Sequence, residues 1–267
     1  MCCMMNEVLY GIRVVLCFSF FAYASWSDLK TREVSNKVWI IMAPLALALT
    51  LFQFVLFNPE SLPLYVISFA ITAALSIALF YVGAFGGADA KALVCLALAL
   101  PIYPNILFQF NVPRVSPIFP LTVFSNAVLL AAFSVVYAIL RNFFWRLRTG
   151  RRLFEGFENE SIWRKILAFL TGYKVKMAEL ERGYMYPLED IQTKEAGEIE
   201  RKLLVLPKDE ERETIIGRIL NAKQEGKLPN EVWATLGLPL LVFITLGFIV
   251  SLILGDLIWI LLSLILT

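Results

Sequence analysis

The segment VWIIMAPLALALTLFQFVLF, residues 38–57, contains no charged side chain. A helix of roughly 20 apolar residues is long enough to cross the hydrocarbon core of a membrane. The whole chain has the same bias, because hydrophobic residues make up 59% of its 267 positions and charged residues only 17%. A soluble domain carries about a quarter charged residues. The sequence therefore predicts an α-helical protein that crosses the membrane several times.

Six apolar segments are long enough to span. Their approximate limits are residues 8–27, 38–57, 62–84, 90–110, 121–141 and 238–262. We expect a membrane domain at 1–141 with the first five helices, a soluble module at 142–234, and the last helix within 235–267. The fold class is thus a six-span membrane protein with a small α+β module before its last helix.

The polar module has recognisable local patterns. Residues 173–177 and 184–186 alternate between apolar and polar side chains, which predicts short strands. Residues 210–225 predict an amphipathic helix with Ile215, Ile216, Ile219 and Leu220 on one side. These patterns are typical of a small solvated domain.

Basic residues predict the orientation, because cytoplasmic loops retain Lys and Arg. The loop after the first predicted helix is basic, the loop after the third contains Lys91, and residues 141–227 contain most of the others. Only Arg13 and Arg114 fall toward the opposite side. We expect both termini outside the cell membrane and the polar module in the cytoplasm.

Two features of the composition narrow the chemistry. The chain has no histidine, which excludes Ser-His and Cys-His nucleophile pairs and histidine zinc sites. Its four cysteines form no C-x-x-C pair, so we expect no metal and no cofactor. A net charge of +2 gives no indication of a nucleic-acid partner. Carboxylates, lysines or hydroxyls must then carry any catalysis.

Two aspartates stand out because ionisable residues at membrane depth are unfavourable without a reason. Asp28 follows the first apolar segment, and Asp89 follows a glycine-rich turn, residues 83–87. Each has an ordinary explanation when taken alone. Asp28 could be an interfacial residue in a polar loop, and Asp89 could cap the next helix through its free backbone N–H groups.

The predicted topology places both aspartates on the cytoplasmic side. Two carboxylates close together cannot both ionise readily, so one retains a proton while the other stays charged. This division suits peptide hydrolysis, because the ionised partner activates water and the protonated partner polarises the scissile carbonyl. Asp256 does not fit the pair, since it lies about 18 residues, or roughly 27 Å, into the last predicted helix.

The second aspartate carries a family resemblance. Gly86-Gly87-Ala88-Asp89, followed by Lys91, resembles the G-x-G-D-x-K signature of type IV prepilin peptidases, most closely the archaeal preflagellin peptidases. Ala88 departs from the glycine that many relatives have at this position. The resemblance implies that Asp89 is catalytic and that the other four residues support its motif.

The first aspartate is similar to the other motif of the same family. Asp28 is followed by Arg32, Val34 and Asn36, and about sixty residues separate it from the second aspartate. The resemblance implies that Asp28 is catalytic and that Arg32 and Asn36 support it. The paired cysteines of bacterial relatives are missing, which puts methyltransferase activity in doubt.

The resemblance also implies the partners. The substrates would be prepilin- or preflagellin-like proteins with a basic leader and an apolar segment lying in the lipid bilayer. A bond just before that segment would sit at the cytoplasmic interface. Two other functions remain open at this point: a small transporter that uses the same aspartates for cations or protons, and a catalytically silent assembly protein.

Overall fold

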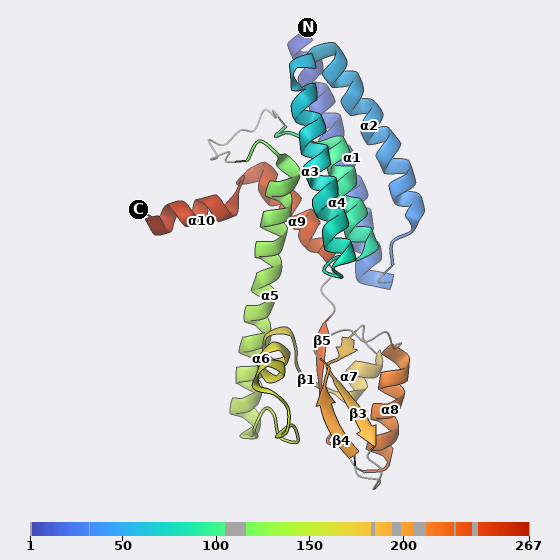
Figure 1. The fold of residues 1–267 in the computed structure, drawn as a ribbon, viewed down its shortest axis with the longest axis vertical. Helices are drawn as coiled ribbons and strands as arrows, with labels where there is room; N and C mark the ends of the chain where they lie inside the picture. Colours follow the sequence, from blue (N-terminus) through green and yellow to red (C-terminus); the bar gives the residue numbers. More distant parts are fainter. Residues whose placement is uncertain are drawn as a thin grey trace. The chain divides into compact units, whose positions relative to one another are not determined.

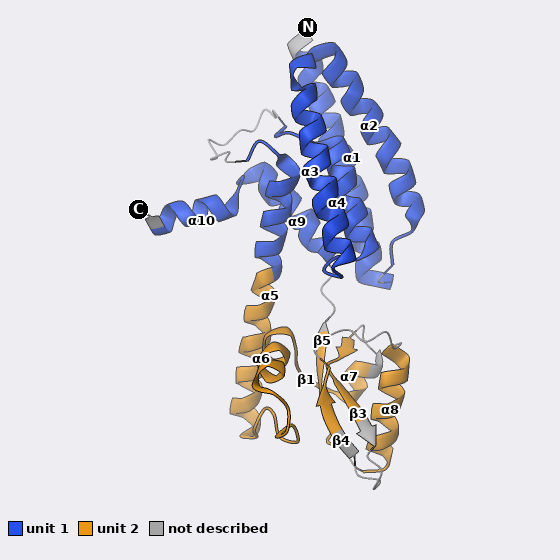
Figure 2. Ribbon diagram, viewed as in Figure 1, with its two compact units in different colours: residues 1–131, 239–267 blue, residues 132–238 orange. Residues whose placement is uncertain are grey.

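The structure is a computed structural model. It describes residues 2–31, 33–104, 116–182, 185–193, 199–204, 212–226, 228–236 and 240–266. The chain divides into two compact units (Figure 2). Unit 1 comprises residues 1–131 and 239–267, and unit 2 comprises residues 132–238.

Unit 1 is a helical bundle (Figure 1). Its helices are α1 (Cys2–Thr31), α2 (Asn36–Phe57), α3 (Leu62–Tyr81), α4 (Gly87–Ala99), the first part of α5 (Phe119–Thr149), α9 (Leu240–Ile253) and α10 (Leu257–Leu266), with a short 3-10 turn at Pro59–Ser61. Helix α4 packs against α2 and α3 and, less extensively, against α1. The sequence prediction of a mostly helical protein is confirmed.

The described residues support four or five candidate spans, so the six spans predicted from the sequence are not confirmed. Among the described residues, four helices are long and apolar enough to cross a membrane: α1, α2, α3 with the turn before it, and α5. Helices α9 and α10, bent by 64° at a short break, could form a fifth. The prediction of one helix over residues 90–110 is wrong in extent, because α4 ends at Ala99. Leu100 precedes Pro101, and a residue before proline disfavours the helical conformation.

The last predicted helix is broken rather than continuous. Gly255 has a φ of +79°, which glycine adopts readily. The Asn126 side chain donates to the Gly255 carbonyl at 2.7 Å and accepts the Leu257 N–H at 3.0 Å. Asp256 accepts two N–H groups of the first turn of α10 at 3.1 and 3.2 Å. Side chains therefore satisfy the backbone groups that the break exposes.

Arg13 of α1 is fully buried in unit 1. Its Nη1 donates to the Thr50 hydroxyl of α2 at 3.1 Å and to the carbonyl of Ala99, the last residue of α4, at 3.0 Å. The guanidinium also lies over the rings of Tyr10 and Phe54, at 4.5 and 5.3 Å from their centroids. This arginine joins three helices, which the sequence analysis did not predict.

Unit 2 contains two small antiparallel sheets. The first has the order β1 (Tyr173–Lys176), β5 (Glu231–Leu236), β2 (Met185–Pro187), and the second pairs β3 (Glu189–Thr193) with β4 (Ile199–Leu203). Its helices are the end of α5, then α6 (Ile162–Thr171), α7 (Met177–Arg182) and α8 (Arg212–Gln224). The predicted strands match β1 and β2. The predicted amphipathic helix matches α8, whose Ile215, Ile216 and Ile219 are buried.

Candidate functional site

The two predicted aspartates lie at the same end of the unit 1 bundle. Helix α1 runs toward this end, α2 returns from it, and the α3–α4 loop turns there again (Figure 1). Asp28 is in the last turns of α1 and Asp89 is in the first turn of α4. Both side chains are partly buried.

The α3–α4 loop has a defined geometry. Gly83 has a φ of +79°, and the N–H groups of Ala84 and Phe85 both donate to the carbonyl of Leu79. Phe85 is buried in the unit 1 core. These contacts end α3 and turn the chain so that α4 begins only a few residues later.

The carboxylate of Asp89 folds back on this loop. Its Oδ2 accepts the N–H of Gly86 at 3.0 Å. A Cβ on Gly86 would lie 3.0 Å from that oxygen, whereas a Cβ on Gly87 would have ordinary contacts, the nearest with the Phe80 ring at 3.7 Å. A methyl group at position 86 would therefore displace the Asp89 carboxylate, whereas one at position 87 would not. Asp89 is therefore not the N-cap considered from the sequence. It is the third residue of α4, and its carboxylate accepts the N–H of the capping residue Gly86, which leaves the second carboxylate oxygen for other contacts.

A second contact joins two of the predicted supporting residues. Lys91 Nζ donates to the side-chain carbonyl of Asn36 at 2.7 Å, which links α4 to the first residue of α2. Ser35 caps α2 and accepts the N–H of Lys37. The sequence analysis named Lys91 and Asn36 separately, but it did not predict that they touch.

Electrostatics connect the two aspartates. Asp89 lies outside the helices that are long and apolar enough to cross a membrane. Burial raises the pKa of Asp89 to about 6, the hydrogen bond from Gly86 opposes this rise, and the negative charge of Asp28 adds to it. The two carboxylates are thus near enough for one charge to influence the other, although they come from helices about sixty residues apart in the sequence.

The remaining predicted residues are less informative. Ala88 packs against the unit 1 core, and Arg32 lies outside the described residues. Asp256 caps α10 and takes no part in the contacts around Asp89. Within the described residues, no three His, Cys, Asp or Glu side chains gather in a way that could hold a metal ion.

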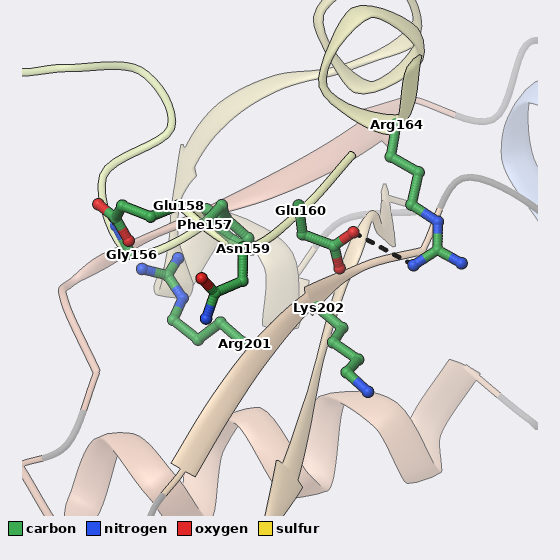
Figure 3. A pocket seen from close by; sticks show the side chains of 8 residues that line it. All are labelled: Gly156, Phe157, Glu158, Asn159, Glu160, Arg164, Arg201 and Lys202. Atoms are coloured by element: carbon green, nitrogen blue, oxygen red, sulfur yellow. Dashed lines mark hydrogen bonds and ion pairs between the residues drawn. The ribbon is translucent and has the colours of Figure 1, made fainter. Parts of the chain in front are cut away.

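Unit 2 contains a charged cavity of about 170 Å³ (Figure 3). Residues 156–160 line it together with side chains from α6 and β4. Glu160 accepts the N–H of Leu203 at 2.9 Å and pairs with Arg164 at 3.2 Å. These contacts fasten the 156–160 loop to a strand and a helix, so we interpret the cavity as structural.

Comparison with known proteins gives matches over both units. A family model described as "Type IV leader peptidase family" matches residues 15–140, and one described as "Archaeal Peptidase A24 C-terminus Type II" matches residues 164–257. The chain is 29% identical over 241 residues to a preflagellin peptidase of Methanococcus voltae, covering 87% of this chain and 91% of the relative. It is 25% identical over 241 residues to a preflagellin peptidase of Methanococcus maripaludis, covering 87% and 90%.

These matches agree with the apolar helices and confirm the resemblance found in the two aspartate motifs. The matched regions include Asp28, Asp89 and most of unit 2. The chain is a membrane protein, and it belongs to the archaeal preflagellin and type IV prepilin peptidase family.

Proposed function

We propose that the chain is an aspartyl endopeptidase that removes leader peptides from prepilin- and preflagellin-like proteins. The family supports the reaction, since its named relatives are preflagellin peptidases. The observation that carries the assignment to particular residues is the electrostatic influence of Asp28 on Asp89. Two neighbouring carboxylates can activate water without a metal ion or a histidine, because one can act as a base while the other acts as an acid.

The raised pKa of Asp89 suggests how the pair divides its protons. At neutral pH the pair holds a proton more readily than an isolated aspartate, because burial and the second charge both disfavour the doubly ionised state. We propose that this proton resides mainly on Asp89, which would donate a hydrogen bond to the scissile carbonyl. Asp28 would then take a proton from the attacking water. In this scheme the two groups would titrate as a coupled pair.

The supporting residues would position Asp89. The Gly86 N–H holds one carboxylate oxygen, and the contact between Lys91 and Asn36 ties the first turns of α4 to α2. Lys91 is a positioning residue in this scheme, because its ammonium binds Asn36 rather than either aspartate. Arg32, Gly87 and Ala88 remain proposed motif residues on the strength of the family resemblance.

The substrate would approach along the bilayer. An apolar groove of about 460 Å³ runs between α1 and α2, lined by Phe20, Tyr23, Val38 and Ile41 among others, and it reaches Ser35, next to Asn36. We propose that the apolar segment of the substrate lies in this groove. The bond that precedes it would then reach the aspartates from the lipid side.

The orientation is part of the proposal. We propose six membrane crossings, with both termini outside. Residues 142–234 would form the cytoplasmic module. The excess of Lys and Arg in the loops after α1 and in the module supports this orientation.

A cleavage assay tests the assignment. The full chain in liposomes is incubated with a tagged preflagellin and with a tagged prepilin, beside Asp28→Ala, Asp89→Ala and Asp256→Ala. We expect the first two variants to lose leader removal by about 10²–10⁴-fold, the usual contribution of an acid–base group. Asp256→Ala should retain it. Cleavage that survives the loss of either Asp28 or Asp89 would refute the pair, and ion flux without cleavage would support the transporter.

A further inference from the structure

Helix α6 of unit 2 presents an apolar face outward. Ile162, Trp163, Ile166 and Leu167 are 73%, 76%, 40% and 44% exposed. At about 100° per residue they fall within an arc of roughly 140° on one side of the helix. An apolar stripe of this width is normally buried, and tryptophan is enriched where a protein meets the headgroups of a membrane.

The opposite face of α6 holds the helix on unit 2. Ala168 is fully buried in a cluster with Phe157, Leu188, Leu203 and Trp233. The outward apolar face is therefore not the surface by which α6 packs on its own domain. Its exposure is a property of the helix as it sits in unit 2.

One buried side chain fixes α6 at a particular level along α5. Asn142 is fully buried, and its Nδ2 donates to the carbonyls of Phe169 and Gly172 at 3.1 and 2.7 Å, where α6 ends (Figure 1). Asn142 directly follows Arg141, the first charged residue of α5. A hydrocarbon core takes roughly 20 residues of helix, which is the distance from the start of α5 to about Arg141. The end of α6 is thus tied to α5 at the level where a hydrocarbon core that begins at the start of α5 would end.

Charged side chains line a cavity next to α6, and three of the five are basic. Arg146 of α5, Arg152 of the following loop and Lys165 of α6 line one cavity of about 480 Å³, together with Glu155 and Glu158. A helix with an apolar face, a small excess of neighbouring cations and a tryptophan in its first turn resembles helices that lie in the headgroup region and favour anionic lipid.

We propose that α6 is an interfacial helix whose apolar face enters the lipid leaflet on the side of unit 2, with the neighbouring basic side chains against anionic headgroups. The occupant of this face is lipid rather than a second copy of the chain. The level of α6 on α5 and the cations beside it both suit a membrane surface. The inference does not depend on the catalytic proposal, because none of its residues belongs to the aspartate site.

A spin-label experiment on the full chain tests this inference. Cys2 and Cys3 are replaced by serine, and the buried Cys17 and Cys95 by alanine, so that Ile166→Cys can carry a single nitroxide. The protein is placed in phosphatidylcholine vesicles with and without phosphatidylglycerol. We expect the label to collide with oxygen several-fold more, relative to a water-soluble nickel complex, than a label at Lys176→Cys, an exposed position of β1. Phosphatidylglycerol should increase this difference.

The same spectra identify the other outcomes. If the Ile166→Cys label is as accessible to the nickel complex as the Lys176→Cys label, α6 faces water and the proposal is wrong. Dipolar broadening that grows with protein density would show that a second copy covers the face, which also overturns it. If the label at position 166 enters the lipid equally with and without phosphatidylglycerol, the role proposed for the neighbouring basic side chains is wrong.

Discussion

Acidic side chains occupy opposite environments in the two units. Glu189 of unit 2 is 1% exposed, and both its carboxylate oxygens accept from Arg201, at 2.8 and 2.9 Å. In unit 1, Asp89 accepts one backbone N–H, has no basic partner among the described residues, and experiences the negative charge of Asp28. The arginine makes Glu189 part of the structure of unit 2. Burial and, to a smaller extent, the like charge of Asp28 raise the pKa of Asp89 to about 6, so this carboxyl group takes up a proton closer to neutral pH than an ordinary aspartate does.

The largest expected effect separates activity from stability at Asp89. We predict that Asp89→Asn lowers leader cleavage by about 10²–10⁴-fold. The melting temperature at neutral pH should not fall, because a raised pKa means that the folded state disfavours the charged carboxylate. Asparagine also keeps an acceptor for the Gly86 N–H. Cleavage kinetics and thermal unfolding in detergent measure the two quantities; a clear fall in melting temperature would mean that Asp89 is structural.

At Glu189 we expect a loss of stability, in contrast to the loss of activity expected at Asp89. Glu189→Gln should destabilise unit 2 by about 3–5 kcal/mol, because Arg201 is left as a mostly buried, unpaired charge. Denaturant unfolding followed by tryptophan fluorescence measures this loss of stability. Trp233 lies at the site, because its backbone N–H donates to Glu189. The matched control is Glu213→Gln, which breaks an ion pair whose carboxylate is 75% exposed and should change little. Equal effects of the two changes would contradict the contrast between buried and exposed pairs.

A smaller effect is expected from crowding the Asp89 carboxylate. Gly86→Ala places a methyl group 3.0 Å from Asp89 Oδ2 and should lower cleavage by roughly 10-fold to 100-fold through misplacement of the carboxylate. Gly87→Ala meets nothing closer than 3.7 Å and serves as the control. Steady-state kinetics should place the loss mainly in kcat. If Gly87→Ala were the more damaging change, the substrate rather than Asp89 would require the glycine.

The smallest effect concerns the positioning contact. Lys91→Met removes the 2.7 Å bond to Asn36 and should lower cleavage by roughly 3-fold to 10-fold, since the pair is solvent-exposed. Asn36→Ala should have a similar effect, and the double variant should be no worse than either single change. Additive losses would show that Lys91 and Asn36 act independently.

Much of the fold could be predicted because apolar length is a strong signal. Helices α2 and α3 match their predicted segments closely, since no proline or charge interrupts the last turns of either. The end of α4 and the break at Gly255 were not predicted. Both depend on local backbone chemistry within an apolar run, and the break also depends on Asn126 from a distant helix.

The candidate site could also be predicted only in part. Asp28 and Asp89 could be named from two short motifs and a topology. The contact between Lys91 and Asn36 could not, because it depends on how α4 packs against α2. Arg13 was noticed only as a basic residue in an apolar segment; its bonds to Thr50 and Ala99 require the packed bundle. The sequence analysis did not predict α6, because Arg164 and Lys165 separate its apolar residues along the sequence.

The most direct test of the shared site is the titration of Asp89 with and without Asp28. Carbon-13 NMR of the side-chain carboxyls in aspartate-labelled protein follows the group, and Asp89→Asn identifies its signal. We predict a pKa near 6 in the unmodified chain. In Asp28→Asn the pKa should fall yet stay above the ordinary value of about 3.9, because burial is the larger cause of the rise. An ordinary pKa for Asp89, or one that Asp28→Asn leaves unchanged, would contradict the pairing of the two aspartates.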